Sequence, residues 1–332
     1  MRAWMRRGLL ACALWPVSLV FRALSAGRAG LYRAGILKSE RLPVPVVVAG
    51  NVFVGGTGKT PLTIWLAESL RAAGFTPGVI SRGHGSEAVF VREVTRFSDV
   101  GKVGDEPLLI AQRTGCPVFV GRKRVDAGRA LLAAHPEVDV IISDDGLQHY
   151  PLARDVEIVL FDSRGAGNGW LLPAGPLREP ARRRRDFTVV NAPHIPAKLE
   201  RQVGGAPYRM QLGGSVAIRL NGIERAPLSA LANRRLLAAA GIGNPGRFFA
   251  MLREAGLAFE ELPLPDHYDF IANPFAQANA DVILITEKDA VKCRQLEHLN
   301  NDPRLWVVPV SAQIDAALAK QIVEKCRGRP TA

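Results

Sequence analysis

From residue 43 onward, short apolar runs alternate with longer stretches whose apolar positions recur with a helical period. Most of the runs are continuous and rich in β-branched residues, a pattern typical of strands that are covered on both faces. The stretch from Lys59 to about Ala73 is typical of a helix and ends at Gly74. The pattern therefore predicts a parallel sheet with helices on both faces. Its strands are expected within 43–50, 76–81, 117–121, 138–144, 156–162 and 187–192.

After about residue 193 the pattern changes. Apolar positions alternate and glycines come in pairs over 193–220, which indicates a hairpin-like linker. A second α/β series follows, with strands expected within 235–243, 281–289 and 306–312 and helices near 246–255 and 313–327. Ligands commonly bind in the cleft between two such lobes. We thus expect four parts: an N-terminal segment (1–35), a main α/β domain (36–200), a linker (201–225) and a smaller C-terminal α/β lobe (226–332).

The N-terminus differs from this globular pattern. Residues 8–21 form an uncharged run behind Arg2, Arg6 and Arg7, and this run is shorter than the roughly 20 apolar residues that span a bilayer. A basic start and the small residues at 23–26 also resemble a signal peptide. The stretch 50-GNVFVGGTGKTPL-62, a glycine-rich loop between an apolar strand and a helix, is typical of nucleotide binding and argues against secretion, because such a site requires cytosolic ATP.

We interpret this segment as a helix that lies in the membrane interface, with Trp15 and Phe21 among its apolar contacts. Three arginines would then face the lipid headgroups: Arg22, Arg28 and Arg33. The alternative is a helix packed on the protein's own core.

Composition adds two constraints. The 332-residue chain is long enough for about two domains, and its hydrophobic content of 48% is ordinary for a globular protein. Its 43 Lys and Arg residues outnumber 31 Asp and Glu, and the net charge of +12 favours a polyanionic partner such as anionic lipid, phosphorylated substrate or nucleic acid. The four cysteines form no CxxC pair, so neither a zinc site nor a disulfide framework is indicated, and a reducing, cytosol-facing location fits best.

The stretch 50-GNVFVGGTGKTPL-62 lies between an apolar strand and a helix, where backbone N–H groups converge on a phosphate. Lys59 is expected to reach the β- and γ-phosphates, and the Thr60 hydroxyl to bind Mg²⁺. The usual phosphate-binding loop has glycine at the position of Phe53, so this loop is a variant; the alternative is an ordinary glycine-rich turn. Three glycines permit close backbone approach and positive φ: Gly55, Gly56 and Gly58.

Two further motifs supply carboxylates. An apolar strand ends in Asp144 and Asp145, where a rigidly held carboxylate can orient Mg²⁺, although Asp-Asp-Gly also forms plain turns. In 104-GDEPLL-109, Asp105 is either a helix N-cap, with Pro107 in the first turn, or a general base that takes a proton from an acceptor hydroxyl. Together with the glycine-rich loop, the carboxylates favour Mg–nucleotide chemistry.

Eight motifs occur in order over residues 50–292: GNVFVGGTGKTP, SRGHG, GDEP, SDDGLQHY, GNGWLLPAGPLRE, GIGNPGRFF, PDHY and TEKDAVK. Together they resemble the tetraacyldisaccharide 4′-kinase family of the lipid A pathway. The resemblance covers most of the chain, including the N-terminal apolar segment, and the family's loop departs from the usual pattern in the same way. One departure from the family is His84, where the family usually has tyrosine.

The resemblance implies ATP-dependent phosphorylation of the 4′-hydroxyl of a tetraacylated glucosamine disaccharide 1-phosphate, at the cytosolic face of a Gram-negative inner membrane. It implies that Asp105 is the base and works with His267 from the second lobe. Lys59 and Arg124 would stabilise the transferring phosphoryl group. The remaining implied contacts are Thr60, Asp144 and Asp145 to Mg²⁺, Glu106 and Glu179 to the substrate, and Val54, Gly55, Gly56, Thr57, Gly58, Lys59, Thr60 and Pro61 to ATP.

Other interpretations stay open from the sequence. A membrane-associated P-loop ATPase switch fits the loop and the basic N-terminus, but Val54 stands where such switches carry a lysine. A GTPase is disfavoured because its base-reading motif has only the near match 286-TEKD-289. The arginines at 182–185 form either a solvated loop or a contact to anionic lipid or to the acceptor's 1-phosphate. Nucleic acid is disfavoured, because no aromatic-interleaved basic motif accompanies them.

Overall fold

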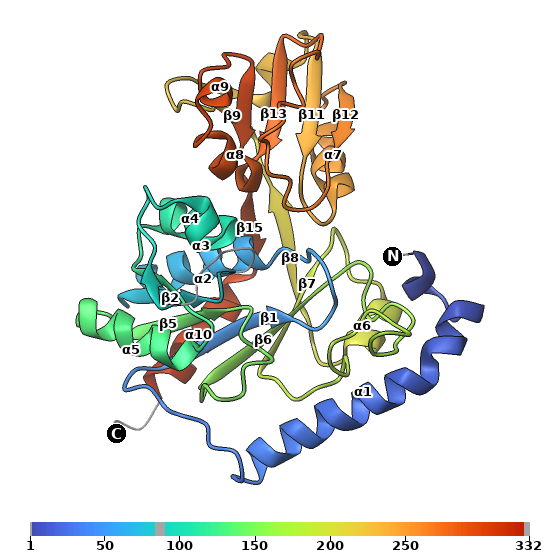
Figure 1. The fold of residues 1–332 in the computed structure, drawn as a ribbon, viewed down its shortest axis with the longest axis vertical. Coiled ribbons are helices and arrows are strands. Elements are labelled where there is room, and N and C mark those ends of the chain that lie inside the picture. Colours follow the sequence, from blue (N-terminus) through green and yellow to red (C-terminus); the bar gives the residue numbers. More distant parts are fainter. Residues whose placement is uncertain (1, 84–89, 329–332) are drawn as a thin grey trace.

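The computed structural model describes residues 2–83 and 90–328, which fold into two lobes, each built on its own sheet (Figure 1). His84, the departure noted in SRGHG, lies outside the described residues. Among the described residues, nine strands form the sheet of the first lobe and six form the sheet of the second lobe. The α/β fold class predicted from the sequence is confirmed.

The larger sheet has the strand order β15-β8-β7-β6-β1-β5-β2-β4-β3. Neighbouring strands from β8 to β4 are parallel, and β15 and β3 pair antiparallel at the two edges. The central strands are buried along their whole length, as their continuous apolar runs predict. The strands are β1 (Val46–Asn51), β2 (Pro77–Ser81), β3 (Arg92–Glu93), β4 (Val118–Val120), β5 (Val140–Asp144), β6 (Val156–Asp162), β7 (Phe187–Asn191), β8 (Tyr208–Gly213) and β15 (Ser311–Ile314).

Helices cover both faces of the larger sheet. Side chains of one helix set share a hydrophobic core with one face, and those of a second set share a separate core with the other face. The first set is α2 (Lys59–Ala72), α3 (Val100–Val103), α4 (Asp105–Thr114) and α10 (Ala316–Arg327), and the second is α5 (Arg124–Ala134) and α6 (Ala197–Val203).

The smaller sheet has the order β10-β9-β14-β13-β11-β12 and is parallel from β14 to β12. One hydrophobic core includes α7 and the short helix η2, and the other includes α8 and α9, so this sheet is also covered on both faces. Its elements are β9 (Val216–Arg219), β10 (Arg225–Pro227), η2 (Leu228–Leu231), β11 (Leu236–Ala240), α7 (Pro245–Glu254), β12 (Glu260–Pro263), β13 (Val282–Thr286), α8 (Glu287–Cys293), α9 (Glu297–Asn300) and β14 (Leu305–Val308).

The chain crosses between the lobes twice. β8 belongs to the larger sheet and β9 to the smaller one, so the hairpin expected within 193–220 is not formed; each strand finds its partners in a different sheet. The apolar run 306–312 is two strands rather than one, because Pro309 has no backbone N–H to continue the ladder. β15 and α10 then return to the larger sheet, whereas the sequence placed this tail with the C-terminal lobe.

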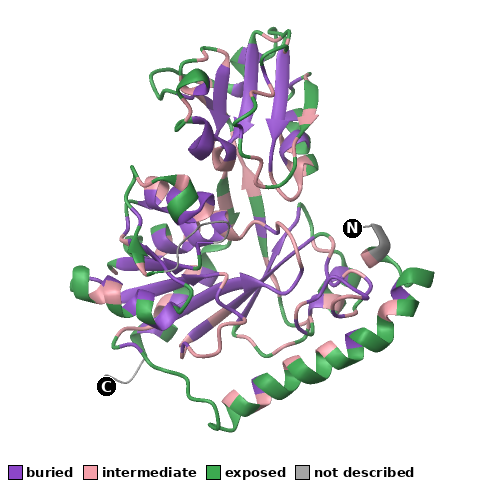
Figure 2. Cartoon of the chain, viewed as in Figure 1, coloured by how far each residue is buried: buried purple, intermediate pink, exposed green. Residues whose placement is uncertain are grey.

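Helix α1 (Leu9–Arg33) follows the short helix η1 (Arg2–Met5) and runs along the first lobe on the side away from the second lobe (Figure 1). It is mostly exposed (Figure 2). It is 25 residues long, and the mean hydropathy of its most apolar 18-residue window is 1.7, so it meets the length and composition test for a membrane span, a test that core helices and signal sequences also pass. Only 11% of its most apolar window is buried, so α1 is not packed into the protein's core. Its exposed apolar surface indicates membrane association.

A narrow strip of α1 is tied to the loop at 168–177. The Ser18 hydroxyl donates to Leu171 O (2.8 Å) and accepts from Ala174 N (2.9 Å). Before the helix begins, the indole N–H of Trp4 donates to Pro173 O (3.0 Å). The two bonds of Ser18 are buried, so they fix which side of α1 faces the protein, and most of the helix's large apolar side chains remain exposed.

Candidate active site

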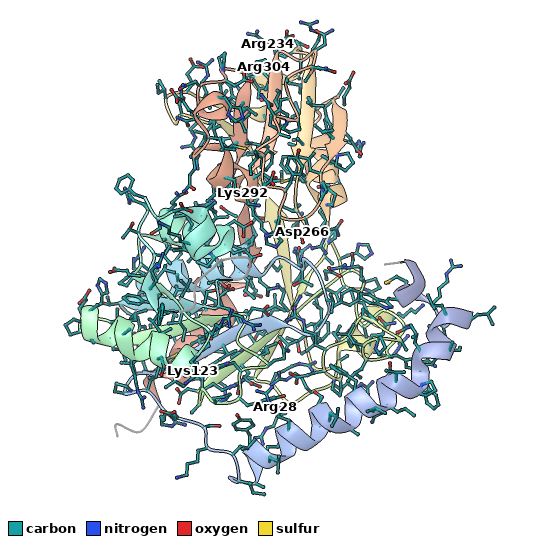
Figure 3. All side chains as sticks on the ribbon, in the orientation of Figure 1. Arg28, Lys123, Arg234, Asp266, Lys292 and Arg304 are labelled. Atoms are coloured by element: carbon teal, nitrogen blue, oxygen red, sulfur yellow. The ribbon has the colours of Figure 1, made fainter. Side chains whose placement is uncertain are left out.

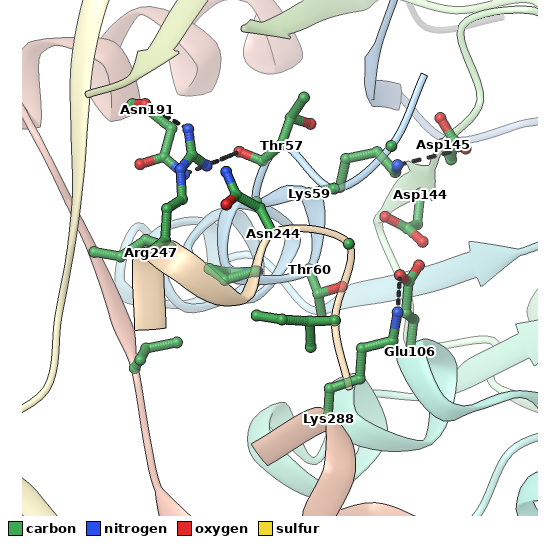
Figure 4. A pocket seen from close by; sticks show the side chains of 18 of the residues that line it. Thr57, Lys59, Thr60, Glu106, Asp144, Asp145, Asn191, Asn244, Arg247 and Lys288 are labelled. Carbon is green, nitrogen blue, oxygen red and sulfur yellow. Dashed lines mark hydrogen bonds and ion pairs between the residues drawn. The ribbon is translucent and has the colours of Figure 1, made fainter. Parts of the chain in front are cut away.

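A cavity of about 1030 Å³ lies between the two lobes. Its walls come from the glycine-rich loop after β1, the ends of β2 and β5, the start of α4, and loops of the second lobe (Figure 4). Ligands of open parallel sheets bind at such carboxyl ends of strands. The predicted site residues that line it are Val54, Gly55, Gly56, Thr57, Gly58, Lys59, Thr60, Pro61, Glu106, Arg124, Asp144, Asp145 and His267.

The glycine-rich loop is held by donors behind it. Asn51 Nδ2 donates to Gly55 O (3.1 Å), and Arg164 Nη2 donates to Gly56 O (3.0 Å). Because the N–H and C=O of a trans peptide point in opposite directions, carbonyls pulled away from the cavity turn their N–H groups toward it. Gly58 has φ of 101°, and a Cβ there would lie 2.5 Å from a neighbouring amide nitrogen, so only glycine fits.

The second lobe also donates a hydrogen bond to the glycine-rich loop. Arg247, from α7, donates through Nη1 to Thr57 O (3.3 Å), and Asn191 Nδ2 donates to the same oxygen (2.9 Å). The other end of the Arg247 guanidinium, Nη2, lies 3.2 Å from the buried carboxylate of Asp162. Figure 4 shows Arg247 reaching Thr57 and Asn191 across the junction. The glycine-rich loop is thus in contact with both lobes.

Two adjacent carboxylates stand beside this loop in different environments. Asp144 is buried and accepts from Thr63 Oγ1 (3.0 Å); burial, together with the charges of Glu106 and Asp145, raises its pKa to about 6. Burial also opposes ionisation of Asp145, but Lys59, with Nζ 3.7 Å from Oδ2, and a nearby arginine hold its pKa below the usual value. The two groups therefore differ in protonation behaviour although they are neighbours in sequence.

These carboxylates fit a magnesium ion that is completed by a nucleotide. Asp145 Oδ1 is buried without a hydrogen-bond partner, and Thr60 faces the same space as Asp144 and Glu106 (Figure 4). Within residues 2–83 and 90–328, no group of three or more His, Cys, Asp or Glu side chains could hold a metal ion by itself. Mg²⁺ is commonly bound through one or two carboxylates plus phosphate oxygens and water.

Arg124 supports the carboxylates from behind. Its side chain is buried, and Nη2 donates to Asp144 O (3.1 Å) and Asp145 O (3.4 Å), while Nε has no partner. Burial lowers the Arg124 pKa to about 10, which leaves the guanidinium charged at neutral pH. Arg124 therefore fixes the turn that carries both carboxylates and brings a cation to the cavity wall.

Asp105 and His267 meet at the other end of the cavity. His267 Nδ1 lies 2.9 Å from Asp105 Oδ2, and the His267 ring lines the cavity in front of the buried Asp105. Asp105 is not the N-cap of α4: Gly104 holds that position, and Asp105 Oδ1 accepts from the N–H of Glu106 (2.9 Å). His267 has φ of 61°, a conformation that is uncommon for residues other than glycine and that clusters at functional sites.

Each member of this pair changes the pKa of the other. Burial would raise the pKa of Asp105, but the hydrogen bond from His267 and the charges of Lys288 and Lys292 hold it well below the usual range. The hydrogen bond to Asp105 raises the pKa of His267, against burial and the charge of Lys288. The carboxylate is therefore ionised throughout the physiological pH range.

Comparison with known proteins identifies the family. The family model for tetraacyldisaccharide-1-P 4′-kinase matches residues 10–327. The chain belongs to the tetraacyldisaccharide-1-phosphate 4′-kinase family. It is 64% identical to the tetraacyldisaccharide 4′-kinase of Janthinobacterium sp. (strain Marseille) and 62% identical to that of Herminiimonas arsenicoxydans, in each case over 100% of this chain and 96% of the relative. A crystal structure of LpxK from Aquifex aeolicus in complex with ATP superposes with a TM-score of 0.79 at 28% identity, over 96% of this chain and 99% of that one.

Glu179 lies outside the cavity wall of this family member. Its side chain is buried, with Oε2 3.1 Å from Arg183 Nη1 and 3.0 Å from the Tyr150 hydroxyl. Arg185, the last arginine of the same 182–185 run, donates to Ala181 O (2.7 Å) and to Gly204 O (3.0 Å). Arg182 also donates to Arg201 O (3.0 Å), so three of the four arginines bond neighbouring segments of the first lobe, which neither interpretation of the run had foreseen.

Several residues at the family's site carry no chemical role in the sequence analysis. Lys288 and Lys292 lie in TEKDAVK, and Arg247 lies in GIGNPGRFF, but these motifs served only to identify the family. Lys292 Nζ lies 3.1 Å from Asp105 Oδ2. Arg164 had no motif at all. For Lys288, Lys292 and Arg247 the partners lie in the other lobe, and nothing local in the sequence indicates such a partner.

Proposed function

We propose that this protein transfers the γ-phosphoryl group of ATP to the 4′-hydroxyl of a tetraacylated glucosamine disaccharide 1-phosphate. The observation that carries the proposal is one cavity that joins a phosphate-binding loop to an Asp105–His267 pair, in a chain that belongs to this kinase family. The relative from Aquifex aeolicus binds ATP, which supports ATP as the donor here.

The nucleotide phosphates would lie on residues 54–61, against the N-terminus of α2. Lys59 and Arg124 would neutralise charge that develops on the transferring group, the main contribution that a protein makes to phosphoryl transfer. Thr60, Asp144 and Asp145 would hold Mg²⁺, directly or through water. When bound, Mg²⁺ offsets negative charge on the phosphate oxygens.

The acceptor hydroxyl would meet the Asp105–His267 pair. A sugar hydroxyl is a weak nucleophile at neutral pH, so a positioned base contributes to the rate. In this proposal Asp105 is the base and works with His267: Asp105 is buried and does not itself line the cavity, so the proton would reach it through the His267 ring, which does. Glu106, on the same wall, would contact the substrate; Glu179 would act through the residues around it, because it does not line the cavity.

The acceptor would reach the cavity from the membrane. Arg28, which is labelled on α1 in Figure 3, lines the cavity and lies over the ring of Tyr150 (5.8 Å), so the membrane helix and the cavity share a cationic side chain. Arg28 is also exposed, so a position near the headgroups stays a prediction. We propose that α1 lies in the anionic cytoplasmic leaflet of the inner membrane and that the sugar phosphates enter beside it.

Mass spectrometry tests the proposal. The full-length protein is incubated with Mg–ATP and a tetraacyldisaccharide 1-phosphate, and the lipid product should be heavier by one phosphate. ATP turnover is measured in parallel with and without the acceptor. Full-rate hydrolysis without acceptor, with an unchanged lipid mass, would instead support an ATPase switch. Guanine recognition has no structural support, because Asp289 of the TEKD motif is fully buried.

A further inference from the structure

Helix α8 of the second lobe docks on α4 of the first through pairs of opposite charges. Glu287 accepts from Arg113 Nη1 at 2.5 and 2.6 Å, and Lys288 Nζ lies 3.1 Å from Glu106 Oε1 (Figure 4). Further along α8, Lys292 pairs with Asp105. Figure 3 places Lys292 at the junction of the lobes. The TEKDAVK motif thus supplies most of the charged contacts to α4.

Lys292 is in contact with the Asp105 carboxylate. Both residues are buried, with exposed fractions of 9% and 3%. Lys292 Nζ lies 3.1 Å from Asp105 Oδ2 and donates to Tyr268 O (3.0 Å). A buried carboxylate is costly unless it is paired, and here one oxygen has both Lys292 and His267 as neighbours. Lys292 is therefore one of the groups that hold the buried Asp105 carboxylate in place and compensate its charge.

Lys288 is in contact with the other side of the histidine. Its Nζ lies 3.3 Å from His267 Nε2 and 3.6 Å from Asp266 Oδ1. An ammonium group can only donate, so the neutral ring accepts at Nε2 and carries its proton on Nδ1, which donates to Asp105. Lys288 and Asp105 together thus select one tautomer of His267.

The same helix also holds the backbone of His267. Asp289 Oδ2 accepts from Gly241 N (3.0 Å) and from the Thr286 hydroxyl (2.6 Å). The carbonyl of Gly241 accepts from His267 N (3.1 Å). A Cβ on Gly241 would lie 2.8 Å from Asp289 Oδ1, so this close approach requires glycine. The strained backbone of His267 is therefore fixed by a contact that begins on α8.

We infer that Lys292 and Lys288 are positioning residues of the phosphoryl-transfer site: Lys292 fixes the Asp105 carboxylate, and Lys288 fixes the His267 tautomer. The proton-accepting pair is then complete only when α8 is docked on α4. This inference rests on the proposed function for its kinetic test, but its statement about the tautomer does not.

The kinetic test uses Lys292→Met, Lys292→Arg and a matched control, Lys325→Met, whose exposed lysine pairs with Asp186 far from the cavity. With both substrates saturating, Lys292→Met should lower kcat roughly 10- to 100-fold, as loss of an orienting group typically does. KM for ATP should stay within about threefold, and Lys292→Arg should recover part of the loss. Lys325→Met should match the wild type. A normal kcat in Lys292→Met would overturn the inference.

A double-variant cycle separates positioning from general structural damage. In an Asp105→Asn background, Lys292→Met should lower kcat by less than about threefold, because the carboxylate that Lys292 orients is already gone. An undiminished loss in that background would mean that Lys292 acts elsewhere. The wild-type product in the same assay tests the proposed function itself, so the two failures are distinguishable.

Nitrogen NMR tests the tautomer without any turnover. The protein is labelled with ¹⁵N-histidine, the His267 signals are assigned by their loss in His267→Gln, and the pH is raised until the ¹⁵N shifts of His267 are those of a neutral ring. The wild type should show protonated Nδ1, and Lys288→Met should shift the population toward protonated Nε2. The same tautomer population in both proteins would overturn the role of Lys288. This measurement holds even if Lys292→Met does not fold.

Discussion

His267 Nδ1 lies 2.9 Å from Asp105 Oδ2, although the two residues are 162 positions apart in the chain and belong to different lobes. Neither residue alone would form a proton-accepting pair. The contact exists because the loop after β12 approaches the first turn of α4, where α8 is also docked. Catalysis in the proposed mechanism therefore depends on how the two lobes are held together.

Asp105→Asn tests whether the carboxylate accepts the proton. The amide keeps an oxygen for the Glu106 N–H, but its NH₂ group would face two donors, Lys292 and His267. We expect kcat to fall roughly 100- to 10,000-fold, the range for loss of a general base, and the melting temperature to fall as well. Steady-state kinetics and thermal unfolding check both.

His267→Ala should lower kcat by a smaller factor than Asp105→Asn does. The double variant should lower kcat by less than the product of the two single factors, because paired groups act as a unit. Fully multiplicative losses would mean that Asp105 and His267 act independently. If Asp105→Asn turns over normally, the base must be sought elsewhere, with Asp145 the next candidate.

Lys59→Ala should abolish transfer with the fold intact. Lys59 begins α2, and its Nζ lies 3.7 Å from Asp145 Oδ2 at the cavity wall. Losing a group that neutralises transition-state charge costs on the order of a thousandfold in rate. Single-turnover transfer measures the loss, and circular dichroism checks the fold. Near-normal turnover would remove Lys59 from the mechanism.

Local sequence signals account for the larger part of the fold and for one side of the site. The continuous apolar runs identified the buried strands. The loop at 50–62 could be predicted to bind phosphate because all of its groups are neighbours in sequence. Local sequence signals could not predict which distant segments of the chain pair with one another. The alternation at 208–219 is real, yet β8 and β9 join different sheets, and no local feature of Lys292 indicates Asp105 as its partner.

Arg247→Met should weaken ATP binding through the loop that Arg247 supports. The variant removes one of two donors to Thr57 O and one cation beside Asp162. We expect KM for ATP to rise about tenfold, which corresponds to roughly 1.4 kcal/mol. Arg253→Met is the control, because Arg253 lies on the same helix, is exposed and pairs within its own lobe. Equal KM values for the two variants would show that the contact to Thr57 is irrelevant to ATP binding.

The pH dependence of stability should report the His267 contact. Asp105 raises the His267 pKa in the folded state, so folding favours the charged ring. That stabilisation is fully present below the unfolded pKa of about 6.5 and is lost as pH rises through the folded value. The melting temperature of the wild type should therefore exceed that of His267→Gln by more at pH 6 than at pH 9. A difference that grows with pH would contradict the assigned direction.

Membrane association should depend on the exposed face of α1. Deletion of residues 1–24 would also remove the bonds of Trp4 and Ser18 to the first lobe, so single substitutions on the outer face are the sharper test. Val20 and Leu24 are 60% and 70% exposed. Burying a charge at either position in the interface is unfavourable, so Val20→Asp and Leu24→Asp should each reduce vesicle flotation about tenfold while ATP binding is retained. Ile271→Asp, at a 74% exposed position in the second lobe, should float like the wild type. Equal flotation of all four proteins would mean that α1 does not hold the protein on the membrane.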